Sequence, residues 1–450
     1  MLNLNLPLLV VIALGSMLVV LPAAAWLPRD TQRAMLVAIT AGLFFFSGIG
    51  ASSQEVSGLF VAFYFVTLGG IVLSFIVGLA MFGRISRSAS PKIISALGDI
   101  DGGKVWTWAV VAYVALLFFP LLWPEVRLDR LLSPPAPDLR AVMAARFEGT
   151  IDPFTRLVGY GQLLLTPFFY VALYRWRDRM WFVLLLLVGV LYLEYIAAAY
   201  VGRGVVLKHL VLWIFGVWWW QPRKRKWILL GTFASMPFVL YASYWYARAR
   251  LGAEAGSESL LEAMGSVLAV EWSFVERVGM PLLESGRTVD LPAYALWVAT
   301  LPLPKIFTGP IEGARINYEI SEIVLGVAWG APGSYVVLPG LVAESVYVFG
   351  PFLFWIHALC IGVMAAAFVS LTERIPPFGF VFGLGIWLFG YVLNRAGISA
   401  VLPVIMNEFL LFYCVLGYVY FRSVRPRDTA KEEAVFRRGL PVTEDVSGRA

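Results

Sequence analysis

Residues 6 to 27 have the sequence LPLLVVIALGSMLVVLPAAAWL, an apolar run without a charged residue. A helix of about 20 apolar residues is long enough to cross a hydrocarbon core of roughly 30 Å. No basic segment precedes the run, and it is longer than the apolar part of a usual signal peptide. We therefore interpret it as a retained membrane span.

Similar runs recur along the 450 residues, of which 60% are hydrophobic and only 14% are charged. Soluble domains contain more charge than this, about a quarter of all residues. The composition predicts an all-α polytopic membrane protein with about eleven transmembrane helices, because helices satisfy every backbone polar group within lipid. The predicted spans are residues 6–27, 34–50, 57–83, 105–123, 157–174, 181–200, 205–220, 227–245, 341–371, 378–395 and 400–421.

Lysine and arginine gather in short connectors at the ends of these spans: 29–33, 84–104, 175–179, 221–226 and the tail after Arg422. With an odd number of spans, all of them lie on one side, which the positive-inside rule assigns to the cytoplasm. The N-terminus is then outside and the C-terminus cytoplasmic. Because the net charge of +6 is scattered in this way, membrane lipid rather than nucleic acid is the expected partner.

We predict one transmembrane domain, residues 1–421, and a cytoplasmic tail, residues 422–450, that is charged, poor in aromatic residues and disordered. The domain includes a large extracytoplasmic loop with short helices, residues 246–340. That loop has more acidic than basic residues. The loop is therefore not a general cationic surface, and an anion that binds there must contact individually placed arginines.

One part of the loop has the spacing of a helix with a polar face. If residues 313–326 are helical, that face presents one cation, two carboxylates, a tyrosine and a glycine: Arg315, Glu319, Glu322, Tyr318 and Gly326. The alternative is a surface helix with an intrahelical pair between Arg315 and Glu319, worth a few tenths of a kcal/mol.

A second candidate is Arg203, which lies between Gly202 and Gly204 at the outer end of a predicted hairpin. The hairpin places Glu194 and Lys208 at the same depth, where pairing offsets the cost of charges within the bilayer. This pair could simply lock two helices together. Arg203 could contact lipid headgroups, but the flanking glycines favour contact with a ligand.

Three further residues are expected at the same outer boundary: Glu344, Glu408 and Arg395. Arg395 directly follows Asn394. Arginines suit a diphosphate because the guanidinium fork binds phosphate oxygens bidentately and keeps its charge. A nearby carboxylate suits a general base that takes the proton of a hydroxyl group. For Glu344 the alternative is pairing with one of the arginines.

Several catalytic and metal-binding motifs are absent from the sequence, namely HExxH, CxxC, a Walker loop, DxD and GxSxG. We therefore expect no metal and no cofactor, and neither a protease nor an ATPase. His209 and His357 are expected to be buried polar contacts. Cys360 and Cys414 lie in apolar runs and are expected to be buried packing residues.

Over residues 180 to 420, the chain resembles the Wzy-type polymerases of bacterial O-antigen and exopolysaccharide repeat units. Arg315, the ten residues INYEISEIVL and Gly326 are similar to the family's Arg and Gly motif in a late periplasmic loop. The turn at Arg203 matches an Arg and Gly turn that opens a span in the middle of the chain. A later family signature is similar to Gly340, Glu344, Tyr347 and Gly350.

The resemblance implies a GT-C-like integral-membrane glycosyltransferase of the bacterial inner membrane that uses no metal and no nucleotide sugar. It would join undecaprenyl-diphosphate-linked repeat units, and a chain-length regulator protein is an implied partner. Arg203, Arg315 and Arg395 are expected on the diphosphate, with Glu344 as base or orienting group. The expected substrate-binding residues are Tyr318, Glu319, Glu322, Gly326, Arg248 and Lys305.

Two alternatives have distinct expectations. A flippase or transporter of lipid-linked oligosaccharides would carry charges near the bilayer midplane and open to both sides. An O-antigen ligase is related to the polymerases but uses a periplasmic histidine, and residues 246–340 contain none.

Overall fold

The computed structural model describes residues 4–98, 100–136, 153–198, 201–249, 259–303, 316–329, 331 and 334–424, and no β-strand occurs among them. Nine helical segments in this part of the chain are long and apolar enough to cross a membrane, and the bent pair Ile398–Glu408 and Leu410–Tyr418 makes a tenth. The prediction of an all-α polytopic membrane protein is confirmed. Of the predicted tail, residues 422–450, the first three belong to the helix Leu410–Val424, and the rest lies outside the described residues.

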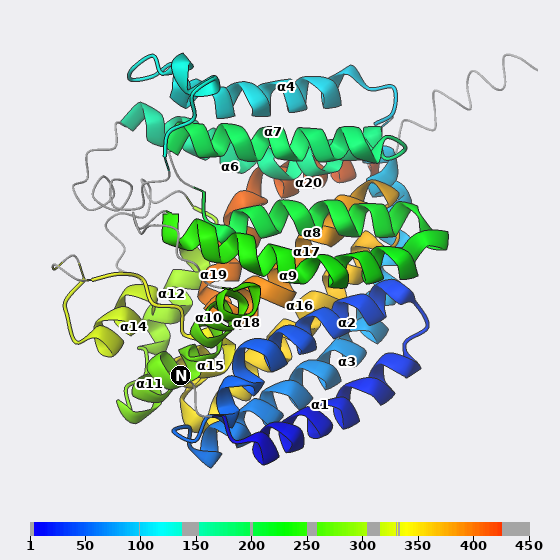
Figure 1. Ribbon diagram of the computed structural model, residues 1–450. Coiled ribbons are helices and arrows are strands. Elements are labelled where there is room, and N and C mark those ends of the chain that lie inside the picture. The colour runs from blue at the N-terminus through cyan, green and yellow to red at the C-terminus, as the bar shows by residue number, and fades with distance from the viewer. Residues whose placement is uncertain are drawn as a thin grey trace, which may run out of the picture.

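The long helices lie side by side in Figure 1, and most of the short ones gather at one end. The long helices are α1 (Leu6–Trp26), α2 (Asp30–Leu43), α3 (Gly58–Leu97), α4 (Lys104–Phe118), α6 (Pro153–Ala172), α7 (Met180–Ala198), α8 (Arg203–Trp220), α9 (Arg225–Ala249), α16 (Trp355–Thr372) and α20 (Leu410–Val424). The others are α10 (Leu260–Trp272), α11 (Met280–Glu284), α12 (Leu291–Thr300), α14 (Ile316–Leu325), α15 (Gly340–Leu353), α17 (Gly379–Gly385), α18 (Leu393–Ala396) and α19 (Ile398–Pro403).

The described residues have two apolar cores. One is formed mainly by α1, α2, α3, α15 and α16, and the other mainly by α4, α6, α7 and α17. Helix α17 joins them, since Phe382 packs in the first core and Phe380 in the second. The outward faces of the long helices keep large apolar side chains exposed, such as Leu18 and Trp181, as a lipid environment requires.

Small residues bring α3 and α16 into close contact. A Cβ atom added to Gly362 would lie 2.0 Å from Ser74 Oγ and 2.5 Å from the backbone oxygen of Ile71, and one added to Gly78 would lie 2.7 Å from Ala366 Cβ. Such small residues are typical of packing between membrane helices, where backbones approach closely.

Gly362→Ala is expected to lower the stability of the protein in detergent by about 1–3 kcal/mol, because the extra methyl group forces α3 and α16 apart. Gly69→Ala is the matched control, since nothing lies within 4 Å of a Cβ at that position of α3. Thermal unfolding of both variants tests the effect. Equal midpoints for the two variants would contradict the tight contact.

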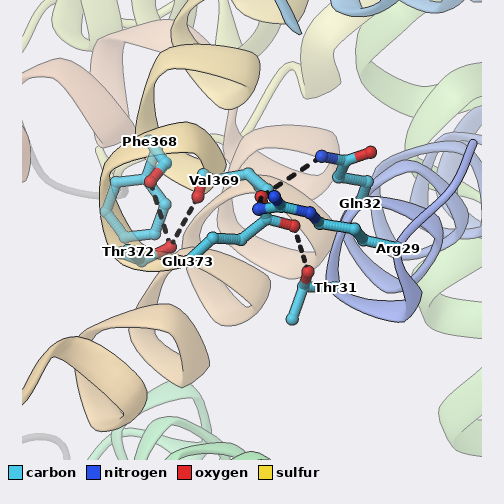
Figure 2. A network of polar contacts seen from close by, with 7 residues as sticks. All are labelled: Arg29, Thr31, Gln32, Phe368, Val369, Thr372 and Glu373. Atoms are coloured by element: carbon cyan, nitrogen blue, oxygen red, sulfur yellow. Dashed lines mark hydrogen bonds and ion pairs between the residues drawn. The ribbon is translucent and has the colours of Figure 1, made fainter. Parts of the chain in front are cut away.

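At one end of the bundle, a carboxylate ties the α1–α2 connector to the end of α16. The Glu373 side chain accepts hydrogen bonds from Arg29 Nη1 at 2.6 Å, from Gln32 Nε2 at 3.2 Å and from the Thr31 hydroxyl (Figure 2). It is only 5% exposed. Three donors therefore satisfy a carboxylate that is almost completely removed from water.

Other basic connectors gather at the same end. Arg225, which begins α9, pairs with Asp30 at 2.6 Å. Burial and the neighbouring guanidinium groups of Arg29 and Arg87 lower the pKa of Arg374. In Figure 1 the connectors α1–α2, α6–α7 and α8–α9 lie at the right-hand end, and α11, α12, α14 and α15 lie at the left-hand end.

The expectation of one continuous span over residues 341–371 is wrong. Gly350 has φ 72° and Pro351 follows it, so the helix breaks there and α15 is a short, largely buried segment. Proline disfavours helical geometry in the preceding residue, and glycine tolerates the left-handed conformation.

The predicted span 205–220 corresponds to α8, which packs against α7 and α9 but is less apolar than the nine segments. Two smaller expectations change. Helix α3 continues to Leu97, past the predicted end at residue 83. Cys360 and Cys414 are exposed rather than buried, since each lies on the outward side of its helix.

Candidate functional site

Arg203 and Arg395, far apart in the sequence, meet at one carboxylate. Glu271 accepts hydrogen bonds from Arg395 Nε at 2.6 Å and Arg395 Nη2 at 3.0 Å. Arg203 Nη2 lies 3.7 Å from Glu271 Oε1. The side chains of Arg203, Arg395 and Glu271 are 23%, 19% and 10% exposed. The predicted convergence of these two arginines is thus present, with Glu271 between them.

The local chain explains where each arginine lies. Arg203 is the first residue of α8, and Gly202 is the N-cap. Arg395 is in the last turn of α18, directly after Asn394, whose side chain is fully buried and donates to the carbonyl oxygens of Ile39, Phe389 and Gly390. This amide fixes the short helix that carries Arg395.

The positive charge of Arg395 also faces two aromatic rings. Its guanidinium carbon lies 5.6 Å from the ring centre of Phe274 and 5.8 Å from that of Tyr391. Such cation–π contacts stabilise a partly desolvated cation. The arginine is therefore held by a carboxylate and by two rings, which restricts its rotamers.

Glu344 is completely buried. It accepts hydrogen bonds from the Ser399 backbone N–H at 2.8 Å and from the Ser399 hydroxyl at 3.0 Å. Burial raises the pKa of Glu344 to about 8, although the hydrogen bonds from Ser399 oppose the shift. The side chain therefore fastens α15 to the start of α19, four residues beyond Arg395. Two roles were expected for Glu344, base and orienting group, and this position suits the orienting group.

The predicted polar face around Glu319 and Glu322 lines an open pocket of about 260 Å³, together with Arg287, Thr288, Ile323 and Tyr347. The Tyr347 hydroxyl donates to Glu319 Oε2 at 2.9 Å. Burial and the bond to Glu319 raise the pKa of Tyr347. The helix expected at 313–326 is α14, Ile316–Leu325, in the described residues.

A neighbouring pocket of about 480 Å³ shares Arg287, Glu322 and Ile323 with the first and is also lined by Gly326. Glu322 accepts from the Trp329 backbone N–H at 2.7 Å. Tyr318 stacks on Trp329, with ring centres 4.1 Å apart. Carboxylates and stacked aromatic rings are side chains that suit a sugar. Both kinds occur on α14 and in the residues that follow it.

Other predicted site residues lie elsewhere. Arg315 and Lys305 are outside the described residues. Arg248, in the last turn of α9, donates to the Tyr244 hydroxyl at 2.8 Å. Lys208 lies near enough to Glu194 and Glu408 to interact electrostatically with both, but the predicted pair of Glu194 and Lys208 does not form an ion pair within 4.0 Å among the described residues. His209 and His357 are buried and hydrogen-bonded, as expected.

Sequence analysis missed two residues of the site, Glu271 and Arg287. Glu271 ends an apolar helix, and Arg287 follows Gly286, which has φ 62°. Both occur in a loop that contains many other charges, so their types alone do not distinguish them. The one available signal was the isolation of Glu271 after the apolar stretch 263–270.

Comparison of the chain with protein-family models, with curated proteins and with solved structures finds no match. Within the described residues, no group of three or more His, Cys, Asp or Glu side chains is placed to bind a metal ion. The chemistry of the site is therefore argued from its own arginines, carboxylates and aromatic rings.

Proposed function

We propose that this protein is a membrane glycosyltransferase that polymerises undecaprenyl-diphosphate-linked oligosaccharide repeat units at the outer face of the bacterial inner membrane. The observation that carries the proposal is the meeting of Arg203 and Arg395 at Glu271, opposite the end where basic connectors gather. The motifs shared with Wzy-type polymerases support the same activity.

The proposed orientation follows from charge. Arginine- and lysine-rich connectors favour the cytoplasmic side, and the end held together by Arg29, Glu373 and Arg225 is rich in them. The arginine pair then lies on the periplasmic side, where lipid-linked repeat units are joined. The N-terminus is outside and the C-terminus is cytoplasmic in this arrangement.

In the proposed reaction, the bond between the donor sugar and its diphosphate breaks, and a hydroxyl oxygen of the acceptor sugar bonds to the same sugar carbon. The electron pair leaves with the diphosphate, and the hydroxyl proton passes to a base. Arg203 and Arg395 stabilise the negative charge on the departing diphosphate. The positive N-terminus of α8 adds to the positive field of the arginines. The two arginines and the helix end together stabilise the negative charge.

We place the acceptor glycan along α14. Glu319, Glu322 and Tyr347 line an open pocket and offer hydrogen-bond partners to sugar hydroxyls. Tyr318 and Trp329 add a stacked aromatic surface. A carboxylate of this pocket is better placed to receive a proton than Glu344, which is completely buried. Glu344 keeps an orienting role through Ser399.

Glu319→Gln is expected to reduce chain growth by about tenfold or more, because hydrogen bonds to a charged group contribute about 1.5–3 kcal/mol. The loss should appear in kcat/KM for the acceptor, because Glu319 is one of the two pocket carboxylates that are available to bind the acceptor and to take its proton. Glu284→Gln, which changes an exposed carboxylate at the end of α11, is the control. A kcat/KM for Glu319→Gln equal to that of the wild type would remove the pocket from the acceptor site.

One observation favours a second candidate, a flippase for lipid-linked oligosaccharides. Lys208 interacts with Glu194 and Glu408 among the spans, and charges at such positions are expensive and commonly functional. A flippase moves its substrate across the bilayer without lengthening the glycan.

Purified protein in liposomes that carry lipid-linked repeat units tests the two candidates. The polymerase proposal predicts a ladder of longer glycans in the presence of a metal chelator and without nucleotide sugar. Movement of the substrate to the other leaflet without a ladder would support the flippase instead.

A further inference from the structure

The two arginines of the proposed diphosphate site carry like charges and are both mostly shielded from water. Arg203 also lies at the N-terminus of α8, where the helix dipole disfavours a cation. Among the described residues, Glu271 is the carboxylate within 4.0 Å of both guanidinium groups. It offsets their repulsion and the unfavourable dipole.

The contacts are also geometrically specific. Glu271 engages Arg395 through Nε and Nη2, which fixes the plane of that guanidinium. The same oxygen that accepts from Arg395 Nη2, Oε1, lies 3.7 Å from Arg203 Nη2. One oxygen atom therefore sets the separation of the two groups, and it keeps them close enough for one diphosphate to bridge.

The segment that carries Glu271 is itself well anchored. Helix α10 begins with a capping box, in which Ser259 and Glu262 exchange hydrogen bonds. Just beyond Glu271, the ring of Phe274 faces Arg395. Two side chains, Glu271 in the last turn of α10 and Phe274 just after the helix, thus contact Arg395 and support the arginine pair.

We infer that Glu271 is a positioning residue that holds Arg203 and Arg395 in the arrangement that receives the diphosphate leaving group. This inference rests on the proposed function, since it names the group that the arginines bind. It makes a prediction that a purely structural role does not make. Removal of the Glu271 charge leaves a site that is more positive but less ordered, so anion binding should strengthen while turnover falls.

The test compares Glu271→Gln with wild-type protein in two measurements. Binding of inorganic pyrophosphate, measured by calorimetry, should become about tenfold tighter, because one negative charge close to the anion is gone. Chain growth at saturating donor should fall about 10- to 100-fold, since loss of orientation by about 1 Å has effects of this size. Unchanged or weaker pyrophosphate binding, or unchanged growth, overturns the inference.

Two further variants make the result specific. Glu262→Ala weakens the cap of the same helix and should leave pyrophosphate binding unchanged; a shift equal to that of Glu271→Gln would indicate a helix-stability effect and overturn the inference. If Glu271→Gln does not fold, Glu271→Asp keeps the charge on a shorter side chain. It should bind pyrophosphate within about twofold of wild type but turn over more slowly, and wild-type turnover would overturn the inference.

The proposed function and this inference can fail separately. If wild-type protein forms no glycan ladder, the polymerase proposal fails, but the comparison of pyrophosphate binding still decides the role of Glu271. If the wild type forms a ladder and Glu271→Gln binds pyrophosphate no more tightly, the polymerase proposal stands and the positioning role does not.

Discussion

Arg395→Lys is expected to fold normally and to lose chain growth by about 100-fold or more, because removal of one preorganised donor to developing negative charge has effects of about 100- to 1,000-fold. Lysine keeps the positive charge near Glu271. It lacks the planar fork that bonds Glu271 through Nε and Nη2, and so cannot bind carboxylate and phosphate in the same way.

The measurement is initial-rate chain growth with a matched cation variant, Arg277→Lys. Arg277 is exposed in the helical turn after α10, so its replacement should leave the rate close to wild type. Near-wild-type growth by Arg395→Lys would show that charge alone is enough at this position, and would remove the bidentate fork from the proposed chemistry.

Gly397→Ala is expected to have the largest effect on stability, about 2–5 kcal/mol, with loss of activity. Gly397 has φ 90°, and an added Cβ would lie 1.6 Å from Glu344 Oε2. The methyl group must displace the buried carboxylate that fastens α15 to α19, and the corner that carries Arg395 moves with it. Thermal unfolding and chain growth of the purified variant measure the two effects.

Gly98→Ala separates backbone strain from the steric clash. Gly98 has φ 65°, in the same left-handed region, but nothing lies within 4 Å of its added Cβ. This variant should show only the strain of a non-glycine residue with positive φ, about 1–2 kcal/mol. If both variants unfold at the same temperature, the contact between Gly397 and Glu344 is not a tight one.

The parts of the structure that follow from hydrophobicity were predictable. Runs such as residues 6–27 and 181–200 became helices α1 and α7 with ends within a few residues, because a long apolar run in lipid has few alternatives to a helix. The clustering of basic connectors at one end followed from the same spans. The convergence of Arg203 and Arg395 then followed from their shared side.

Features that depend on packing were not predictable. Apolar residues continue through Gly350 and Pro351, so the run resembled one span, although a Gly-Pro pair is itself a signal for a break. The full burial of Glu344 depends on α19 folding back over it. Glu271 was hidden because its partners lie 68 residues upstream and 124 residues downstream, and no local pattern marks them.

Chain growth measured together with release of the lipid carrier tests the polymerase proposal most directly. Wild-type protein in liposomes with labelled undecaprenyl-diphosphate-linked repeat units should release one free undecaprenyl diphosphate for each new glycosidic bond, in the presence of a chelator, and Arg395→Lys should release almost none. Transbilayer movement of the labelled substrate with neither longer glycans nor released carrier would contradict the proposal.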